Sequence, residues 1–274
     1  MASRLSLSST APSAAAADPE RLARNVALAR GGDRAALSRA LTLIENGALV
    51  STEMSAEWQD VARHGHRIGL TGAPGAGKST LASALVGEFL HRGRSVAVLA
   101  VDPSSPITGG AVLGDRVRMS AHADDPRVFI RSMASRGNPG GIAATTGASA
   151  LLLAACHYDI VLIETVGTGQ SEVAIVRAAD TIIVAVPPGA GDEVQALKAG
   201  ILEIAHLLVV TKSDLPAAER TANELTSSLA LRTGRGRDVP VVQVCGPKNH
   251  GVAALVNAFE TRRQAKADAS LHSA

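Results

Sequence analysis

Short apolar runs alternate with amphipathic ones along the chain from about residue 64. The apolar runs are rich in Val, Ile, Leu and Ala throughout, as in strands that helices cover on both faces. The strands expected from them are residues 68–71, 95–101, 128–131, 160–164, 181–186, 207–211 and 239–244. Helices or long loops separate these strands. The alternation predicts an α/β fold, with a mostly parallel sheet and helices on both faces.

Two helices are expected before the first strand. Asp18, Pro19 and Glu20 form a helix start, because an Asp cap and a Pro at the first helical position suit the unpaired N–H groups there. That helix is expected to end near Ala29, and Asp33 caps a second one over residues 34–46. The sequence therefore predicts an N-terminal helical extension.

Composition narrows the classes of function. A net charge of +2 gives no reason to expect binding to nucleic acid or to an anionic membrane. No apolar run reaches the roughly 18 residues of a membrane span. Cys156 and Cys245 lack the spacing of a metal site, which indicates structural thiols in a reducing compartment. A cytoplasmic protein is expected.

The segment GAPGAGKST fits the phosphate-binding pattern G-x-x-x-x-G-K-[ST]. Its glycines allow the backbone N–H groups to turn toward a phosphate, and the helix that follows adds a favourable dipole. Lys78 is expected to reach the β- and γ-phosphates, and the Ser79 hydroxyl to bind Mg²⁺. The residues expected to line the phosphates are Gly72, Ala73, Pro74, Gly75, Ala76, Gly77, Lys78, Ser79 and Thr80.

Two acidic residues follow expected strands. Asp102 ends the strand over 95–101, where a carboxylate suits Mg²⁺, directly or through water, or else caps a Pro-rich turn. Glu164 ends the strand over 160–164, three residues before Gly167. In GTPases this spacing puts a carboxylate near Mg²⁺ and a backbone N–H at the γ-phosphate. Lys78, Asp102 and Glu164 are the expected catalytic residues.

Residues 211–214, TKSD, fit the tetrapeptide pattern [N/T]-K-x-D at the end of a late strand, with Thr211, Lys212 and Asp214 in the fixed places. An Asp carboxylate there accepts two hydrogen bonds from guanine, a pair that adenine cannot supply, and the Lys stem packs on the ring. The pattern favours GTP over ATP.

Longer motifs resemble the methylmalonyl-CoA mutase-associated GTPase family (MeaB/ArgK). The similarity extends in order over about residues 39–214. Its motifs are VDPSSP from Val101, TGG from Thr108, GDR from Gly114, RM from Arg118, FIR from Phe129, ETVGTGQSE from Glu164, and PGAGDE from Pro188 with Lys198 following.

The resemblance implies a GTP-hydrolysing chaperone that gates cofactor loading and protects an adenosylcobalamin-dependent acyl-CoA mutase. It implies GTP or GDP and Mg²⁺ as cofactors. By the same resemblance Asp115 joins Ser79, Asp102 and Glu164 at the metal or orders the switch loops. Arg118 belongs to a first mobile loop, whereas Asp192 and Lys198 lie in a segment that signals to the mutase; without the resemblance these two are a helix cap and a solvated Lys.

The sequence also divides the chain into segments. The expected segments are a disordered leader over 1–17, N-terminal helices over 18–63, a P-loop GTPase domain over 64–262, and a short tail over 263–274. A mitochondrial transit peptide is the weaker interpretation of the leader, and with it a matrix location. Family members continue from the tail into a helical arm used for dimerisation, so a homodimer is left open.

Three rival functions are considered. A nickel-delivery GTPase needs Cys or His ligands close together, and the two cysteines provide none. An ATP-dependent small-molecule kinase would not explain residues 164–172 or 211–214. The third rival is a regulatory module that binds nucleotide without hydrolysing it. The presence of Lys78, Ser79 and Glu164 argues only modestly against it.

Overall fold

The computed structural model describes residues 19–48, 50–102, 119–134, 145–165, 172–189, 201–231 and 239–271. Within them, one parallel sheet of seven strands has the order β3-β2-β4-β1-β5-β6-β7. The strands are β1 (His66–Gly72), β2 (Val96–Asp102), β3 (Val128–Ala134), β4 (Ile160–Glu164), β5 (Thr181–Val186), β6 (Leu207–Val210) and β7 (Val241–Gln243). Every strand expected from the sequence is present, and the predicted α/β fold is confirmed.

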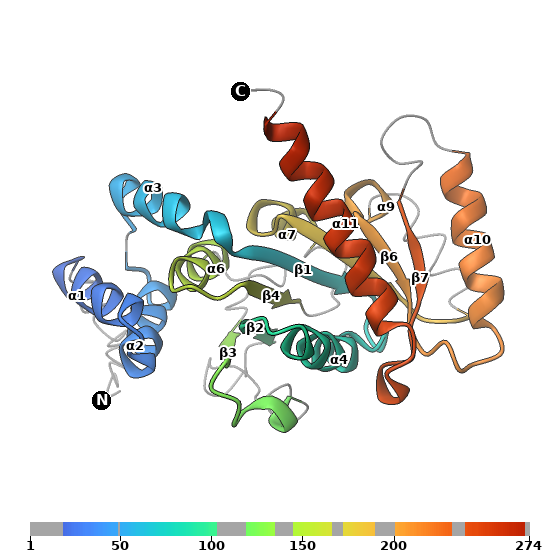
Figure 1. Cartoon of the computed structure of the whole chain (residues 1–274), viewed down its shortest axis with the longest axis horizontal. Helices are drawn as coiled ribbons and strands as arrows, with labels where there is room; N and C mark the ends of the chain where they lie inside the picture. The colour runs from blue at the N-terminus through green and yellow to red at the C-terminus, as the bar shows by residue number, and fades with distance from the viewer. Residues whose placement is uncertain are drawn as a thin grey trace, which may run out of the picture.

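The helices connect the strands and extend the chain at both ends (Figure 1). They are α1 (Pro19–Arg30), α2 (Arg34–Glu45), α3 (Thr52–Val61), α4 (Lys78–His91), α6 (Thr146–Ala155), α7 (Glu172–Ala178), α9 (Ile201–Ile204), α10 (Ala218–Ala230) and α11 (Val252–Leu271), with 3₁₀ turns η1 (Ala62–His64), η2 (Ser120–His122) and η4 (Gly246–Lys248). Of these, α3 and α11 are not among the helices that the sequence predicts. Because α11 is continuous to Leu271, it crosses the domain boundary expected after residue 262.

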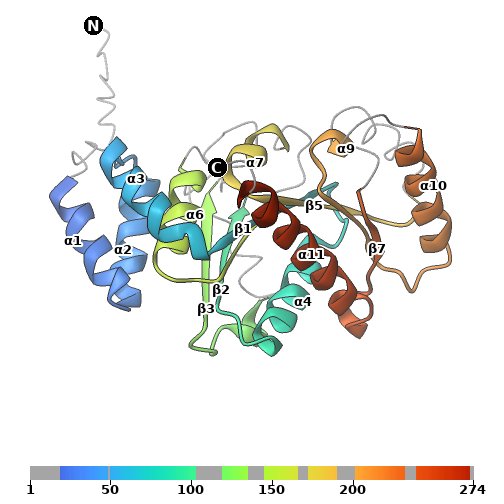
Figure 2. The same cartoon turned by 45° about the horizontal axis from the view of Figure 1, so that its top comes forward.

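Alternate side chains of each strand enter cores on opposite faces of the sheet. On β4, Leu162 packs with α4 and α11, whereas Ile163 packs with α1, α2, α3 and α6. On β5, Ile182 packs with α7 and α10. Figures 1 and 2 show α1–α3 beside α6 at one end of the sheet and α10 at the other. Helices therefore cover both faces.

Close packing of α7 on the sheet explains Gly69 in the middle of β1. A Cβ at this position would lie 2.5 Å from the Ile175 side chain of α7. Since β1 is the central strand, its carboxyl end lies between those of β4 and β5. Ligands of open parallel sheets bind at such an edge, where connections leave in opposite directions. The phosphate-binding loop begins there.

Candidate nucleotide-binding site

The loop between β1 and α4 has a backbone that only glycine adopts easily. Gly72, Gly75 and Gly77 have φ values of 141°, 73° and 83°. At Gly72 a Cβ would also lie 2.2 Å from the carbonyl oxygen of Ala185 on β5. Gly77 caps α4, whose first residue is Lys78. The loop therefore ends at a helix N-terminus, which is the arrangement that binds phosphate.

Lys78 folds back over this loop. Its Nζ donates to the carbonyl oxygens of Gly72 at 2.8 Å and Ala73 at 2.9 Å, and the residue is buried. A cation held at the mouth of a phosphate-binding loop neutralises charge on a bound phosphate.

Ser79 and Glu164 lie in contact, although 85 residues separate them in the chain. The Ser79 hydroxyl donates to Glu164 Oε1 at 2.6 Å, and both residues are buried. The contact forms because β4 pairs with β1, with Leu70 opposite Glu164. A hydroxyl and a carboxylate are oxygen ligands of the kind that Mg²⁺ prefers, so the donor set fits this metal.

Asp102 is the last residue of β2, which pairs with β4. Ala100 lies opposite Glu164 in this pairing, so Asp102 lies two residues further along β2, toward the carboxyl edge of the sheet. The Asp102 side chain lies outside the described part of the chain, as do Asp115, Arg118, Gly167, Asp192 and Lys198. Within the described residues, no group of three or more His, Cys, Asp or Glu side chains is arranged to hold a metal ion. Ser79 and Glu164 are the members of the expected metal site that the structure describes.

Thr211 and Lys212 both bind the backbone of the phosphate-binding loop. The buried Thr211 hydroxyl donates to the Ala76 carbonyl at 2.6 Å and lies 3.3 Å from that of Val186. Lys212 has a φ of 49°, and its Nζ donates to the Gly75 carbonyl at 3.0 Å. The sequence assigned these residues to base recognition, and it did not reveal that they also fasten the loop to the end of β6.

Asp214 is held by two residues from the loop after β7. Lys248 Nζ lies 3.1 Å from Asp214 Oδ2, and the Cys245 thiol also donates to this carboxylate. The Lys248 bond first, then the Cys245 bond, hold the pKa of Asp214 below its usual value. Asp214 is therefore an ionised acceptor, as guanine recognition requires. Its contact with Lys248 leaves no signal in the sequence.

A pocket of about 140 Å³ lies between the start of α4, the end of β6 and the loop after β7. It is lined by Gly77, Thr80, Leu81, Thr211, Lys212, Val244, Gly246 and Pro247. A Cβ at Gly246 would lie 3.1 Å from the Thr80 side chain, so glycine permits the close approach of this loop to α4. Val244 and Gly246 thus lie beside the phosphate-binding loop and the start of α4.

The family model for the methylmalonyl-CoA mutase-associated GTPase MeaB matches residues 37–274. A protein of Pyrococcus abyssi named as a GTPase is 43% identical over 237 residues, which cover 85% of this chain and 73% of that protein. The mouse mitochondrial methylmalonic aciduria type A homolog is 39% identical over 252 residues, covering 85% of this chain and 60% of that protein.

Among solved structures, the LAO/AO transport system kinase superposes with a TM-score of 0.69 at 28% identity. The match covers 92% of this chain and 78% of that one. Sequence, fold and the arrangement of the phosphate-binding loop therefore agree. The chain belongs to the MeaB family of methylmalonyl-CoA mutase-associated GTPases.

Proposed function

We propose that this GTPase uses a GTP cycle, with Mg²⁺, to gate cofactor loading into an adenosylcobalamin-dependent acyl-CoA mutase and to protect that enzyme from inactivation. Membership of a mutase-associated family supports the choice of partner. The observation that carries the catalytic part is the buried contact between Ser79 and Glu164 beside Lys78. Three groups with complementary roles in phosphoryl transfer meet there.

Each of these side chains has a role in GTP hydrolysis. Lys78 moves from the Gly72 and Ala73 carbonyls to the phosphate oxygens, where its charge offsets the charge that develops in the transition state. Ser79 and Glu164 hold the metal, directly or through water. When bound, Mg²⁺ supplies further neutralisation of the phosphate oxygens. Asp102 and Asp115 complete this site in our proposal.

Guanine is selected by Asp214, with Thr211 and Lys212 keeping the phosphate-binding loop in register with the base site. Because Lys248 and Cys245 stabilise the ionised carboxylate, Asp214 presents acceptors only. Guanine offers two donors to such a group, and adenine does not.

Signalling to the mutase is assigned to the segment with Asp192 and Lys198, and nucleotide sensing to Gly167 and Arg118. Hydrolysis is slow in isolation and is accelerated by the partner.

No described helix is both long and apolar enough to cross a membrane. Cys156 and Cys245 are free thiols, which supports a reducing compartment. We therefore assign the protein to the cytoplasm, with the mitochondrial matrix as the alternative.

Nickel delivery is the rival function that the structure bears on most directly. Cys156 follows α6 and packs in the core that α1–α3 share, whereas Cys245 lies beside the nucleotide site. Burial raises the pKa of the Cys156 thiol to about 11, which opposes the thiolate that a soft metal needs. The two thiols therefore do not form one site in the described part of the chain.

A protection assay tests the proposed function. A candidate mutase turns over its substrate until it inactivates, alone or with this protein and GTP, and its half-life is measured. We expect the protein to extend the half-life with GTP, and Lys78→Ala to abolish the effect. A half-life that is the same with the wild type, with Lys78→Ala and without the protein contradicts the proposed function.

A further inference from the structure

A groove of about 610 Å³ opens at the amino-terminal edge of the sheet, opposite the nucleotide site. It lies between η1, the start of β1, and the second half of α11. The charged residues that line it are Arg63, Arg67, Asp180, Arg263 and Lys266. We call it the basic groove. Since β1 runs from His66 in this groove to Gly72 in the phosphate-binding loop, a ligand here does not compete with nucleotide.

The basic groove carries excess positive charge. Arg67 is neutralised by Asp180 through bonds of 3.0 and 2.8 Å, and Arg63 pairs with Asp60 at 2.8 Å. Arg263 and Lys266 have no acidic partner within the described part of the chain. Arg263 and Lys266 line the groove together with His66. Burial first, and then these two cations and Arg67, lower the pKa of His66 to about 4, against the opposing effect of Asp180.

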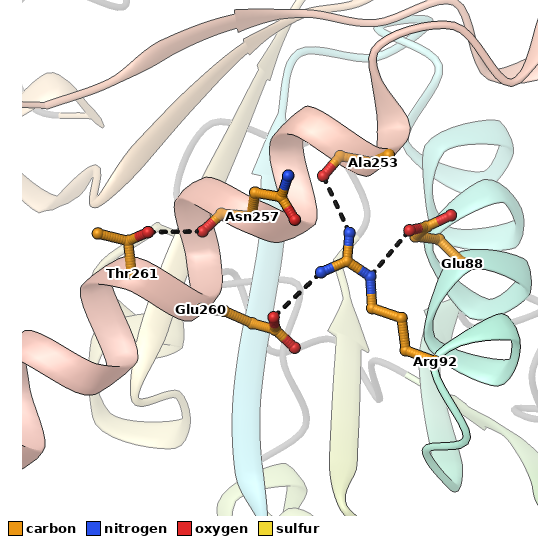
Figure 3. A network of polar contacts seen from close by, with 6 residues as sticks. All are labelled: Glu88, Arg92, Ala253, Asn257, Glu260 and Thr261. Carbon is orange, nitrogen blue, oxygen red and sulfur yellow. Dashed lines mark hydrogen bonds and ion pairs between the residues drawn. The ribbon is translucent and has the colours of Figure 1, made fainter.

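Helix α11 is fastened to α4 by Arg92. Arg92, at the end of α4, donates to Glu260 Oε2 at 3.0 Å and to the Ala253 carbonyl at 3.2 Å, and it also binds Glu88 (Figure 3). These bonds fasten α11 to the helix that begins at Lys78. Arg263, less than one turn beyond Glu260, is thus presented by a helix that is already ordered, which reduces the entropy that binding costs.

The donors of the groove suit carboxylates better than a phosphate group. Phosphate sites are commonly built from backbone N–H groups at a helix start or a nest. Here the N–H groups of Gly65, His66 and Arg67 already donate to Ala62, Asp159 and Asp180 at 3.0, 2.9 and 3.0 Å. The remaining cations, Arg263 and Lys266, are long side chains three residues apart on α11. Residues three apart on a helix lie on neighbouring parts of its surface, so these two cations can each pair with a different acidic side chain of one peptide.

We propose that the basic groove docks an acidic segment of a protein partner, with Arg263 and Lys266 as its main contacts. The excess positive charge, the open groove and the occupied backbone donors all favour an acidic peptide, whichever mutase is the partner. The partner and the nucleotide can be bound together, because the two sites lie at opposite edges of the sheet.

The test uses the GDP-loaded full-length protein and a fluorescent octaglutamate peptide, with octaglutamine as the uncharged probe. Anisotropy is measured at low and at physiological ionic strength. We expect octaglutamate to bind, more weakly as salt rises, and octaglutamine not to bind. The double variant Arg263→Glu/Lys266→Glu should weaken octaglutamate binding by at least about tenfold, since two attractive contacts become repulsive.

Arg262→Glu is the matched control, because Arg262 is exposed on the same helix and does not line the groove. It should leave octaglutamate binding within about twofold. Unchanged GTP hydrolysis shows that each variant is folded. The proposal is overturned if octaglutamate does not bind, or if Arg262→Glu weakens binding as much as the double variant. Displacement of the peptide by inorganic pyrophosphate, or self-association lost in the double variant, would also overturn it.

Discussion

Replacing Thr211 by Val removes the hydroxyl that ties the phosphate-binding loop to β6, while keeping the shape of the side chain. Thr211 is 4% exposed, so solvent does not replace the lost partner. The bond to the Ala76 carbonyl is 2.6 Å long, and Ala76 is fully buried. Losing a buried hydrogen bond of this kind costs about 1–2 kcal/mol.

That cost falls on the loop conformation that binds nucleotide. If the loop loses about 1–2 kcal/mol of stability, the affinity for GDP falls by about 5- to 30-fold. The assay is titration of the protein with a fluorescent GDP analogue, followed by competition with unlabelled GDP and GTP. Both nucleotides should lose affinity by the same factor, because the base contacts of Asp214 are unchanged.

Thr181→Val is the control. Thr181 is also buried, and its hydroxyl lies 2.9 Å from His66 Nε2, at the opposite edge of the sheet. This variant should lose comparable stability in urea but keep its GDP affinity within about twofold. If Thr211→Val keeps wild-type affinity, or if both variants lose it equally, the bond from Thr211 does not order the loop.

Four further predictions follow from described contacts. Glu164→Gln should lower the single-turnover rate of GTP hydrolysis by about 10²-fold or more, because it weakens metal binding. The affinity for GDP without Mg²⁺ should be nearly unchanged. Equal losses of rate and of GDP affinity would contradict a role of Glu164 in holding the metal. Asp214→Asn should shift preference from GTP toward xanthosine triphosphate, measured by competition, because an amide donates to the xanthine oxygen; retained GTP preference would contradict base recognition by Asp214. Arg92→Ala should reduce the free energy of unfolding in urea by about 1–3 kcal/mol, because it breaks the partly buried bonds between α4 and α11. As a control, Arg220→Ala removes an exposed pair with Glu224 and should reduce it by less than about 0.5 kcal/mol. The pKa of His66 is lowered from 6.5 to about 4 in the folded protein, so between pH 6.5 and pH 4 the unfolded chain binds a proton at this residue and the folded protein does not. The free energy of unfolding should therefore fall by up to about 3 kcal/mol as the pH is lowered across that window. Urea unfolding of His66→Gln should show a smaller loss over the same pH range.

The sequence predicts the strands because local pattern determines them. A strand covered on both faces needs apolar residues throughout, and residues 160–164 and 181–186 satisfy this without reference to the rest of the chain. The phosphate-binding loop is predicted for the same reason, since Gly72 and Gly77 are required by the backbone itself. Helix α3 was not predicted, although Ser51 accepts a bond from the Met54 N–H and caps it.

Contacts between distant segments were harder to foresee. The motif around Thr211 indicated a base site, but the bond to Ala76 spans 135 residues and depends on where β6 lies. Lys248 meets Asp214 only because β7 pairs with β6 and brings η4 to that edge. Likewise, Arg92 reaches α11 across 168 residues to Glu260. No periodicity or local motif encodes such pairs.

GTP hydrolysis by the purified protein, with and without an adenosylcobalamin-dependent acyl-CoA mutase and with ATP in parallel, tests the central claim most directly. We expect slow GTP turnover that the mutase accelerates, no comparable turnover of ATP, and loss of the accelerated rate in Lys78→Ala. Preference for ATP, or a GTP rate that no such mutase changes, would contradict a GTP-driven mutase chaperone.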